Sequence, residues 1–260
     1  MSDIGPFGLQ PSAPGLPVSR FRYGQLLRSG RSIATVNQNP SLSRTGFPLL
    51  VTLTGATFVV SIWRIAMAPY QDTMGLIQKI FYFHVPSWMA MGVGVLCCGV
   101  GSAVVVFRNS SKADRIAVAG AELSVLFGLC GLVSGPLWAR KAWGTWWTWD
   151  PKLTIAFMLV LIFVSFLLVR RFGGPGSDKL AAAVGLFGLA VAPFVYVATS
   201  LWRTIHPMNT VVPTLVPGMR GAFWWSSAAF VLLSVVLLTM RVQLEERRAE
   251  VDDLYREREE

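Results

Sequence analysis

The sequence predicts an all-α fold, that of a polytopic membrane protein with six transmembrane helices and both termini in the cytoplasm. Of its 260 residues, 53% are hydrophobic and only 14% are charged, whereas a soluble domain carries about a quarter charged residues. Six apolar runs are also long enough to cross a bilayer, which takes about 20 residues. The distribution of lysine and arginine then indicates the orientation.

The six predicted helices follow one another with short connections. We place them at 48–68, 81–107, 116–138, 153–169, 180–201 and 222–240. The second run is long enough to tilt or to project beyond the membrane. The fourth has a defined start, because Asp150 followed by Pro151 matches a helix N-cap with proline at the first helical position.

The positive charges favour one orientation of these helices. Lysine and arginine gather before the first run, after the last run, and in the connections after the second and fourth runs. Cytoplasmic loops carry such an excess, so both termini are expected in the cytoplasm of a bacterial cell. The other three connections then face outward, to the periplasm of a Gram-negative cell.

Composition divides the chain into three parts. Residues 1–46 are rich in Ser, Pro, Gly and Arg and are expected to form a disordered cytoplasmic extension. Residues 47–240 form the membrane domain, with an external tryptophan-rich loop at about 139–152. Residues 241–260 form a charged cytoplasmic helical tail with a solvated face. The acid-poor start also fits an organellar transit peptide, so a mitochondrial inner membrane is the alternative to the bacterial inner membrane.

Several functional classes are disfavoured by the same composition. The net charge of +9 is not arranged as a basic run interleaved with aromatics, so no nucleic-acid partner is expected. Cys97, Cys98 and Cys130 lie in apolar runs without a C-x-x-C pattern, which argues against redox exchange and zinc binding. No phosphate-binding loop is present, and no enzymatic activity is expected of this chain alone.

Two features that bear chemistry fall on the same side of the membrane. The stretch AWGTWWTWDPKLT, residues 142–154, places four tryptophans in one connection: Trp143, Trp146, Trp147 and Trp149. The only two histidines are His84, at the start of the second run, and His206, just after the fifth. With six helices, parity alone puts both histidines and the tryptophan-rich loop on one side, whichever way the protein is inserted.

Haem is the ligand that these residue types suit. Its iron accepts an imidazole from each face, and indole rings can line its flat macrocycle. Its two carboxylates suit arginine and lysine. Four basic residues lie near the outer face, where the positive-inside rule would discourage them: Arg140, Lys141, Lys152 and Arg203.

Each of these features also has a structural explanation. Tryptophans gather at membrane interfaces in any polytopic protein, and such a belt accounts for Trp63, Trp138, Trp202, Trp224 and Trp225. Capping of the fourth helix is favoured over direct chemistry for Asp150. The intramembrane acid Glu122 is a functional candidate, or it extends to the cytoplasmic surface.

The residues quoted above resemble a known family. WGTWWTWD is similar to the tryptophan-rich signature of the haem-handling membrane proteins of cytochrome c biogenesis, roughly W-G-x-x-W-x-W-D, with Trp146 as an additional ring. FYFHVPSWMAM and LWRTIHP resemble the segments that carry the axial histidines of that family. The resemblance covers about residues 48–240, and it implies that His84 and His206 ligate haem iron.

Six helices and one histidine pair look like the haem exporter protein C type within this family. The resemblance implies haem b bound transiently at the outer face and delivered to a haem chaperone, with ABC transporter subunits as further partners. One alternative comes from the Pro-Lys in WDPKLT, which is similar to the chloroplast and Gram-positive type of haem exporter or cytochrome c synthase subunit. A b-type membrane redox protein is the other, although a single histidine pair at one depth argues against electron transfer across the bilayer.

Overall fold

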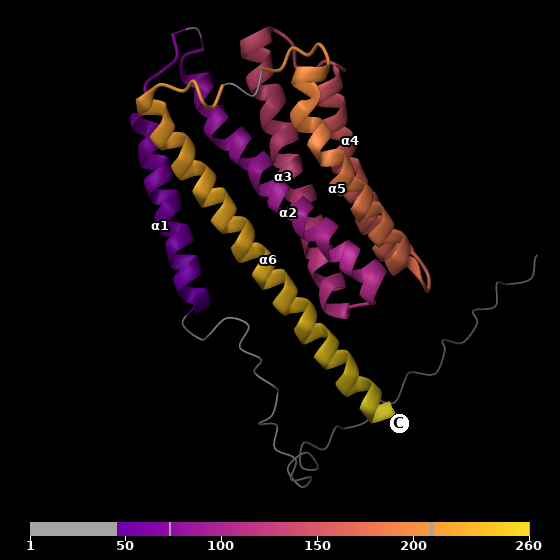
Figure 1. Cartoon of the computed structure of the whole chain (residues 1–260). Helices are drawn as coiled ribbons and strands as arrows, with labels where there is room; N and C mark the ends of the chain where they lie inside the picture. Colours follow the sequence, from indigo (N-terminus) through magenta and orange to yellow (C-terminus); the bar gives the residue numbers. More distant parts are fainter. Residues whose placement is uncertain (1–45, 73, 208–210, 260) are drawn as a thin grey trace, which may run out of the picture. The chain divides into compact units, whose positions relative to one another are not determined.

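The computed structural model of the chain describes residues 46–72, 74–207 and 211–259. These ranges hold six α-helices and one 3-10 helix and contain no β-strand (Figure 1): α1 Gly46–Met67, η3 Leu76–Ile80, α2 Phe81–Arg108, α3 Ser111–Trp143, α4 Pro151–Phe172, α5 Ser177–Leu201 and α6 Pro217–Glu259. All six α-helices are long and apolar enough to cross a membrane. The predicted all-α, six-helix architecture is therefore confirmed, and the side on which the termini lie stays a prediction.

The helices extend beyond the apolar runs, because hydropathy marks only the part of a helix that lies in the bilayer. α3 was expected at 116–138 but runs from Ser111 to Trp143. Ser110 caps its start by accepting a hydrogen bond from the Ala113 N–H at 3.3 Å. Arg140 and Lys141 lie in its last turn, where cations interact favourably with the helix dipole.

The helix bounds shorten the predicted external loop, agree with a helical tail, and leave the N-terminal extension untested. The external loop predicted at about 139–152 is shorter, because α3 continues to Trp143 and α4 begins at Pro151. The predicted helical tail at 241–260 agrees with α6, which continues unbroken from the last apolar run to Glu259. The predicted extension at 1–46 lies outside the described residues except for Gly46, which begins α1.

α2 and α3 pack against each other through glycines that let the two backbones come close. A Cβ atom added at Gly120 would lie 2.5 Å from the backbone nitrogen of Cys98, and one at Gly94 would lie 2.7 Å from the Gly120 carbonyl oxygen. Small residues allow this close approach between membrane helices. The two helices are joined by a short turn in which Asn109 adopts φ 48°.

Gly120→Ala is expected to lower the free energy of unfolding by up to about 2 kcal/mol. The overpacking penalty of about 1–3 kcal/mol exceeds the gain of about 1 kcal/mol that alanine brings over glycine in a helix. Gly92→Ala on α2 is the matched control, because a Cβ there meets nothing within 4 Å. Unfolding of both variants in detergent would test this, and equal stability of the two would contradict the account of the glycine packing.

The main core lies where α2, α3, α4 and α5 pack together. Its fully buried centre includes Met91, Phe163 and Phe166. α6 lies along both α1 and α2 (Figure 1), and α1 packs chiefly against α6. The buried residues of α1 are Thr54, Thr57 and Ser61. The hydroxyls of Thr54 and Thr57 donate to carbonyls of their own helix, at 2.7 and 2.6 Å.

Ion pairs join α3 to α4 and to α6 at the end of the helices that we predict to be cytoplasmic. Glu122 on α3 accepts hydrogen bonds from Arg241 on α6, with Nη2 and Oε1 2.8 Å apart. Arg170 on α4 lies 2.6 Å from Asp114 on α3. Glu122 therefore has a structural partner, which accounts for an acid within an apolar helix without a functional role.

Candidate functional site

Residues from four parts of the chain lie at one end of the helices. His84 lies in the first turn of α2, Trp143 ends α3, Lys152 lies in the first turn of α4, and His206 follows α5. Lys152 is close enough to both imidazoles to act on them electrostatically, and His206 acts in the same way on His84. Figure 1 shows the α3–α4 and α5–α6 connections at the end where α2 begins.

The His84 side chain packs against α3. Its Nδ1 lies 2.9 Å from the hydroxyl of Ser134, and its ring is edge-on to Trp88, with centroids 6.3 Å apart. The surface that receives these rings is made by glycines. A Cβ at Gly135 would lie 3.2 Å from His84 Cε1, and one at Gly131 would overlap the Trp88 indole. The imidazole thus lies close to the backbone of α3.

His206 lies in the connection between α5 and α6 and is half-buried. Its Nδ1 lies 3.0 Å from the carbonyl oxygen of Pro207. A carbonyl only accepts, so Nδ1 carries the hydrogen and Nε2 keeps a lone pair. Burial and the nearby Lys152 lower the pKa of His206 to about 4, which keeps the ring neutral near physiological pH. A neutral ring with a lone pair on Nε2 is the form that binds iron.

The tryptophan-rich connection forms two aromatic clusters. Trp143 lies edge-on to His206, with centroids 6.1 Å apart, and edge-on to Trp138 at 4.9 Å. Trp147 and Trp149 contact each other at 5.8 Å and both contact Phe157 of α4. The first cluster touches a histidine directly. The second projects from the start of α4, and the Trp149 side chain is 71% exposed.

Asp150 is occupied by local structure. Its Oδ1 accepts from the Leu153 N–H at 3.1 Å, and its Oδ2 accepts from the Thr148 hydroxyl at 3.1 Å. The predicted N-cap of α4 is confirmed, with Pro151 at the first helical position. Both carboxylate oxygens serve this turn, so Asp150 fixes the position of Lys152 two residues later.

The remaining basic candidates differ in their surroundings. Arg140 donates from Nη1 to the Gly144 carbonyl and lies 6.0 Å from the centroid of the exposed Trp146 ring. It therefore holds the turn at the end of α3, where Gly144 adopts φ 75°. Lys141 and Arg203 are exposed, and within the described ranges the structure gives neither of them a hydrogen bond or an ion pair. The structure shows no interaction of either side chain with His84 or His206 among the residues it describes.

Two residues that contribute to this region were missed in the sequence. Ser134 contacts His84, and Trp138, which was assigned to the interfacial belt, packs against Trp143. The GLVSG stretch at 131–135 carried a signal, since small residues four apart on a membrane helix indicate a close approach. No comparable signal distinguished Trp138 from the other interfacial tryptophans.

The residues present fit haem. The indole Nε1 atoms of Trp138 and Trp147 are buried without a hydrogen-bond partner in the described part of the chain, and such donors suit carboxylates brought by a ligand. Lys152 adds a positive charge beside both histidines. Two imidazoles, a set of indoles and one cation thus offer iron ligands, flat apolar surface and partners for propionates.

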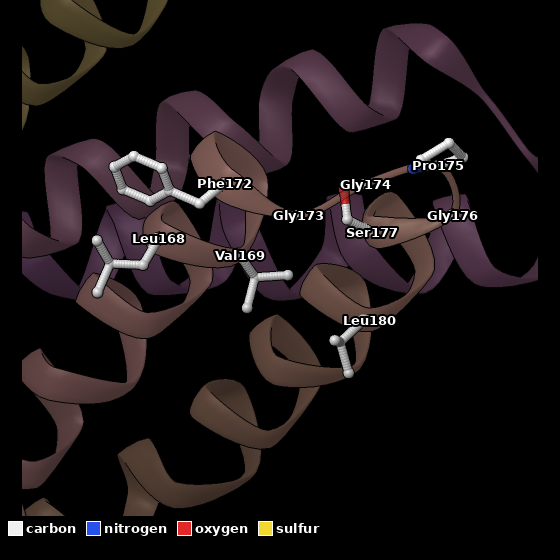
Figure 2. Close-up of a pocket in the computed structure, with 9 residues that line it drawn as sticks. All are labelled: Leu168, Val169, Phe172, Gly173, Gly174, Pro175, Gly176, Ser177 and Leu180. Atoms are coloured by element: carbon white, nitrogen blue, oxygen red, sulfur yellow. The ribbon is translucent and has the colours of Figure 1, made fainter.

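An apolar pocket at the α4–α5 connection is not part of this region. Figure 2 shows its lining, which includes Leu168 and Phe172 from the end of α4 and Leu180 from the start of α5. Lys152 lies at the other end of α4, and a helix of 22 residues is about 33 Å long. The pocket is therefore remote from both histidines.

Comparisons with known proteins agree with these observations. The family model described as heme exporter protein C matches residues 31–259. Heme exporter protein C of Escherichia coli K12 is 30% identical over 206 residues, which are 74% of this chain and 82% of the relative. The protein of the same name from Bradyrhizobium diazoefficiens is 30% identical over 66% of each chain. A cytochrome c biosynthesis ccmC-like mitochondrial protein of Arabidopsis thaliana is 26% identical over 69% of this chain and 70% of its own.

Proposed function

This chain belongs to the heme exporter protein C family, and from that premise we propose that it binds haem at the outer face of the membrane and delivers it to a haem chaperone. Family membership implies a role in haem delivery for cytochrome c biogenesis, in a multi-pass protein of an inner membrane. We propose three further points: the site lies at the outer face, the binding is transient, and the haem passes to a chaperone.

The arrangement of His84 and His206 is the observation that carries this function. They are the only histidines of the chain, they come from elements far apart in sequence, and they are electrostatic neighbours. Each ring has Nδ1 directed at a protein oxygen. This arrangement supports Nε2 of each ring as an axial ligand to haem iron. We assign haem b as the cargo, and it is held without thioether bonds to this chain, because no C-x-x-C-H attachment motif occurs in the sequence.

The neighbouring residues supply the rest of the binding surface. Trp143, next to His206, and the pair Trp147 and Trp149 provide flat apolar contacts for the macrocycle. Lys152 is the basic residue best placed for a propionate, since it acts on both histidines. Arg140, in contrast, contributes through the shape of the turn. Exposed indoles at the edge of the site leave a bound haem accessible to a partner.

To hold haem and release it to a partner, this chain needs iron ligands and an accessible edge of the bound haem. It does not need to catalyse a reaction. We therefore assign it a binding and delivery role rather than an enzymatic one. The partners are the membrane, a haem chaperone and ABC transporter subunits of the maturation complex. The family match favours the C type over the chloroplast and Gram-positive type. The Pro-Lys that suggested the alternative serves here in the capped start of α4.

Direct transfer of haem tests this function. The full-length protein, purified with haem, is mixed with haem-free chaperone, and the two are separated at intervals. We expect the haem absorption to move from this chain to the chaperone without consumption of a nucleotide by this chain. Haem that stays with the chain in the presence of excess chaperone and of the transporter subunits would contradict delivery. Reversible electron exchange with a quinol would instead support the redox alternative.

A further inference from the structure

Resting on the proposed function, we infer that Ser134 is a positioning residue for haem binding. Its hydroxyl accepts a hydrogen bond from the Nδ1–H of His84, which fixes the ring with the Nε2 lone pair available to iron. Ser134 lies on α3, 50 residues after His84 in the sequence. The family's haem-binding pattern, as read in this sequence, contains no serine at this place.

The hydrogen-bond partners of Ser134 determine which way this bond runs. A serine hydroxyl has one hydrogen to donate and two lone pairs that accept. The Ser134 hydroxyl lies 2.7 Å from the Cys130 carbonyl oxygen and 3.3 Å from that of Gly131. Both carbonyls can only accept, so the hydrogen is directed along the helix to Cys130. The lone pairs then face His84, whose Nδ1 is 2.9 Å away.

The surroundings of the ring protect this bond. Ser134 is 5% exposed, so water has little access to replace it. The glycine at 135, whose added Cβ would press on His84 Cε1 at 3.2 Å, lets the ring lie close enough for the bond.

A hydrogen bond at Nδ1 has three consequences for a ligating histidine. It selects the tautomer whose Nε2 can bind metal, it fixes the ring orientation, and it makes the ligand more basic. A more basic ligand stabilises the ferric state, so loss of the bond is expected to raise the midpoint potential of bound haem. Loss of such a partner typically lowers metal affinity by about 10–100-fold.

The first test is made on the haem-free protein. In full-length protein labelled with ¹⁵N-histidine, nitrogen–proton correlation spectra report which ring nitrogen carries the proton. The two histidine signals are assigned with His206→Ala. We expect the His84 proton on Nδ1. A proton on Nε2 of His84 would overturn the inference, because the Ser134 hydroxyl would then be the donor.

The second test compares three variants in the haem-loaded protein. Ser134→Ala is expected to lower haem affinity by about tenfold and to raise the midpoint potential, and Ser134→Thr, which keeps the hydroxyl, is expected to restore both. Ser124→Ala is the matched control. Ser124 is a buried serine on the same helix whose hydroxyl donates in the same way, to the Gly120 carbonyl at 2.8 Å. Wild-type affinity and potential in Ser134→Ala, or the same changes in Ser124→Ala, would overturn the inference.

The two proposals can fail separately. A wild-type protein that carries the Nδ1 proton on His84 but binds no haem would contradict the proposed function and leave the hydrogen bond intact. A protein that binds haem through His84 while the ring carries its proton on Nε2 in the haem-free state would overturn the role of Ser134 alone.

Discussion

Replacing His84 or His206 by alanine is expected to abolish the low-spin, bis-histidine absorption spectrum of the haem-loaded protein. Loss of a residue that hydrogen-bonds a metal ligand typically lowers metal affinity by about 10–100-fold. Loss of the ligand itself is therefore expected to lower haem retention by more than about tenfold. Each substitution removes the only imidazole available on its side of the site, because the chain has two histidines. The Soret and α bands of each purified variant, loaded with haem in parallel with the wild type, measure the effect.

Chemical rescue separates loss of a ligand from loss of the fold. An alanine at 84 leaves open the space that the ring occupies above Gly135, so added imidazole can enter and restore the low-spin bands. Rescue is expected to be weaker at 206, where the lost ring also contacts Trp143. Unchanged bands in either variant without imidazole would show that the corresponding histidine does not ligate the iron.

The combined replacement of Trp143, Trp147 and Trp149 by alanine is expected to reduce haem loading of the chaperone by at least about tenfold. Each aromatic contact contributes about 0.5–1.5 kcal/mol, and one factor of ten corresponds to about 1.4 kcal/mol. The three rings belong to both aromatic clusters of the connection. Haem recovered on the chaperone after co-expression is the quantity to measure.

A matched control removes three indoles elsewhere at the same end of the helices. Trp63 near the end of α1 and Trp224 and Trp225 near the start of α6 are all exposed, as expected of an interfacial belt. Their combined replacement by alanine should leave chaperone loading close to that of the wild type. If both triple variants lowered loading equally, the tryptophan-rich connection would be reduced to a membrane anchor.

Features that depend on neighbouring residues were predictable from the sequence. Apolar length located the six helices, and the Asp-Pro pair located the start of α4, because solvation and capping are decided within a few residues. Parity predicted that both histidines and the tryptophan-rich connection lie on one side of the membrane. That inference needs only the number of helices.

Features that depend on distant contacts were not predictable in the same way. Glu122 accepts a hydrogen bond from Arg241, which is 119 residues away in the sequence. Ser134 is 50 residues away from His84. Only helix packing brings these pairs together. The extent of α3 was underestimated, because its polar ends carry no hydropathy signal. Of the four basic candidates at the outer face, the structure favours Lys152, a choice that depends on the three-dimensional position of the start of α4.

The partnership of α1 with α6 has a consequence for the order of synthesis. Among the described helices, the first to leave the ribosome packs chiefly against the last. α1 therefore stays in the bilayer without this partner until α6 has been made. A polar face would be costly during that interval. Thr54 and Thr57 avoid much of this cost, because their hydroxyls are already bonded to carbonyls of their own helix. A nascent chain can therefore carry α1 as an ordinary lipid-facing helix and dock it as the final step of assembly.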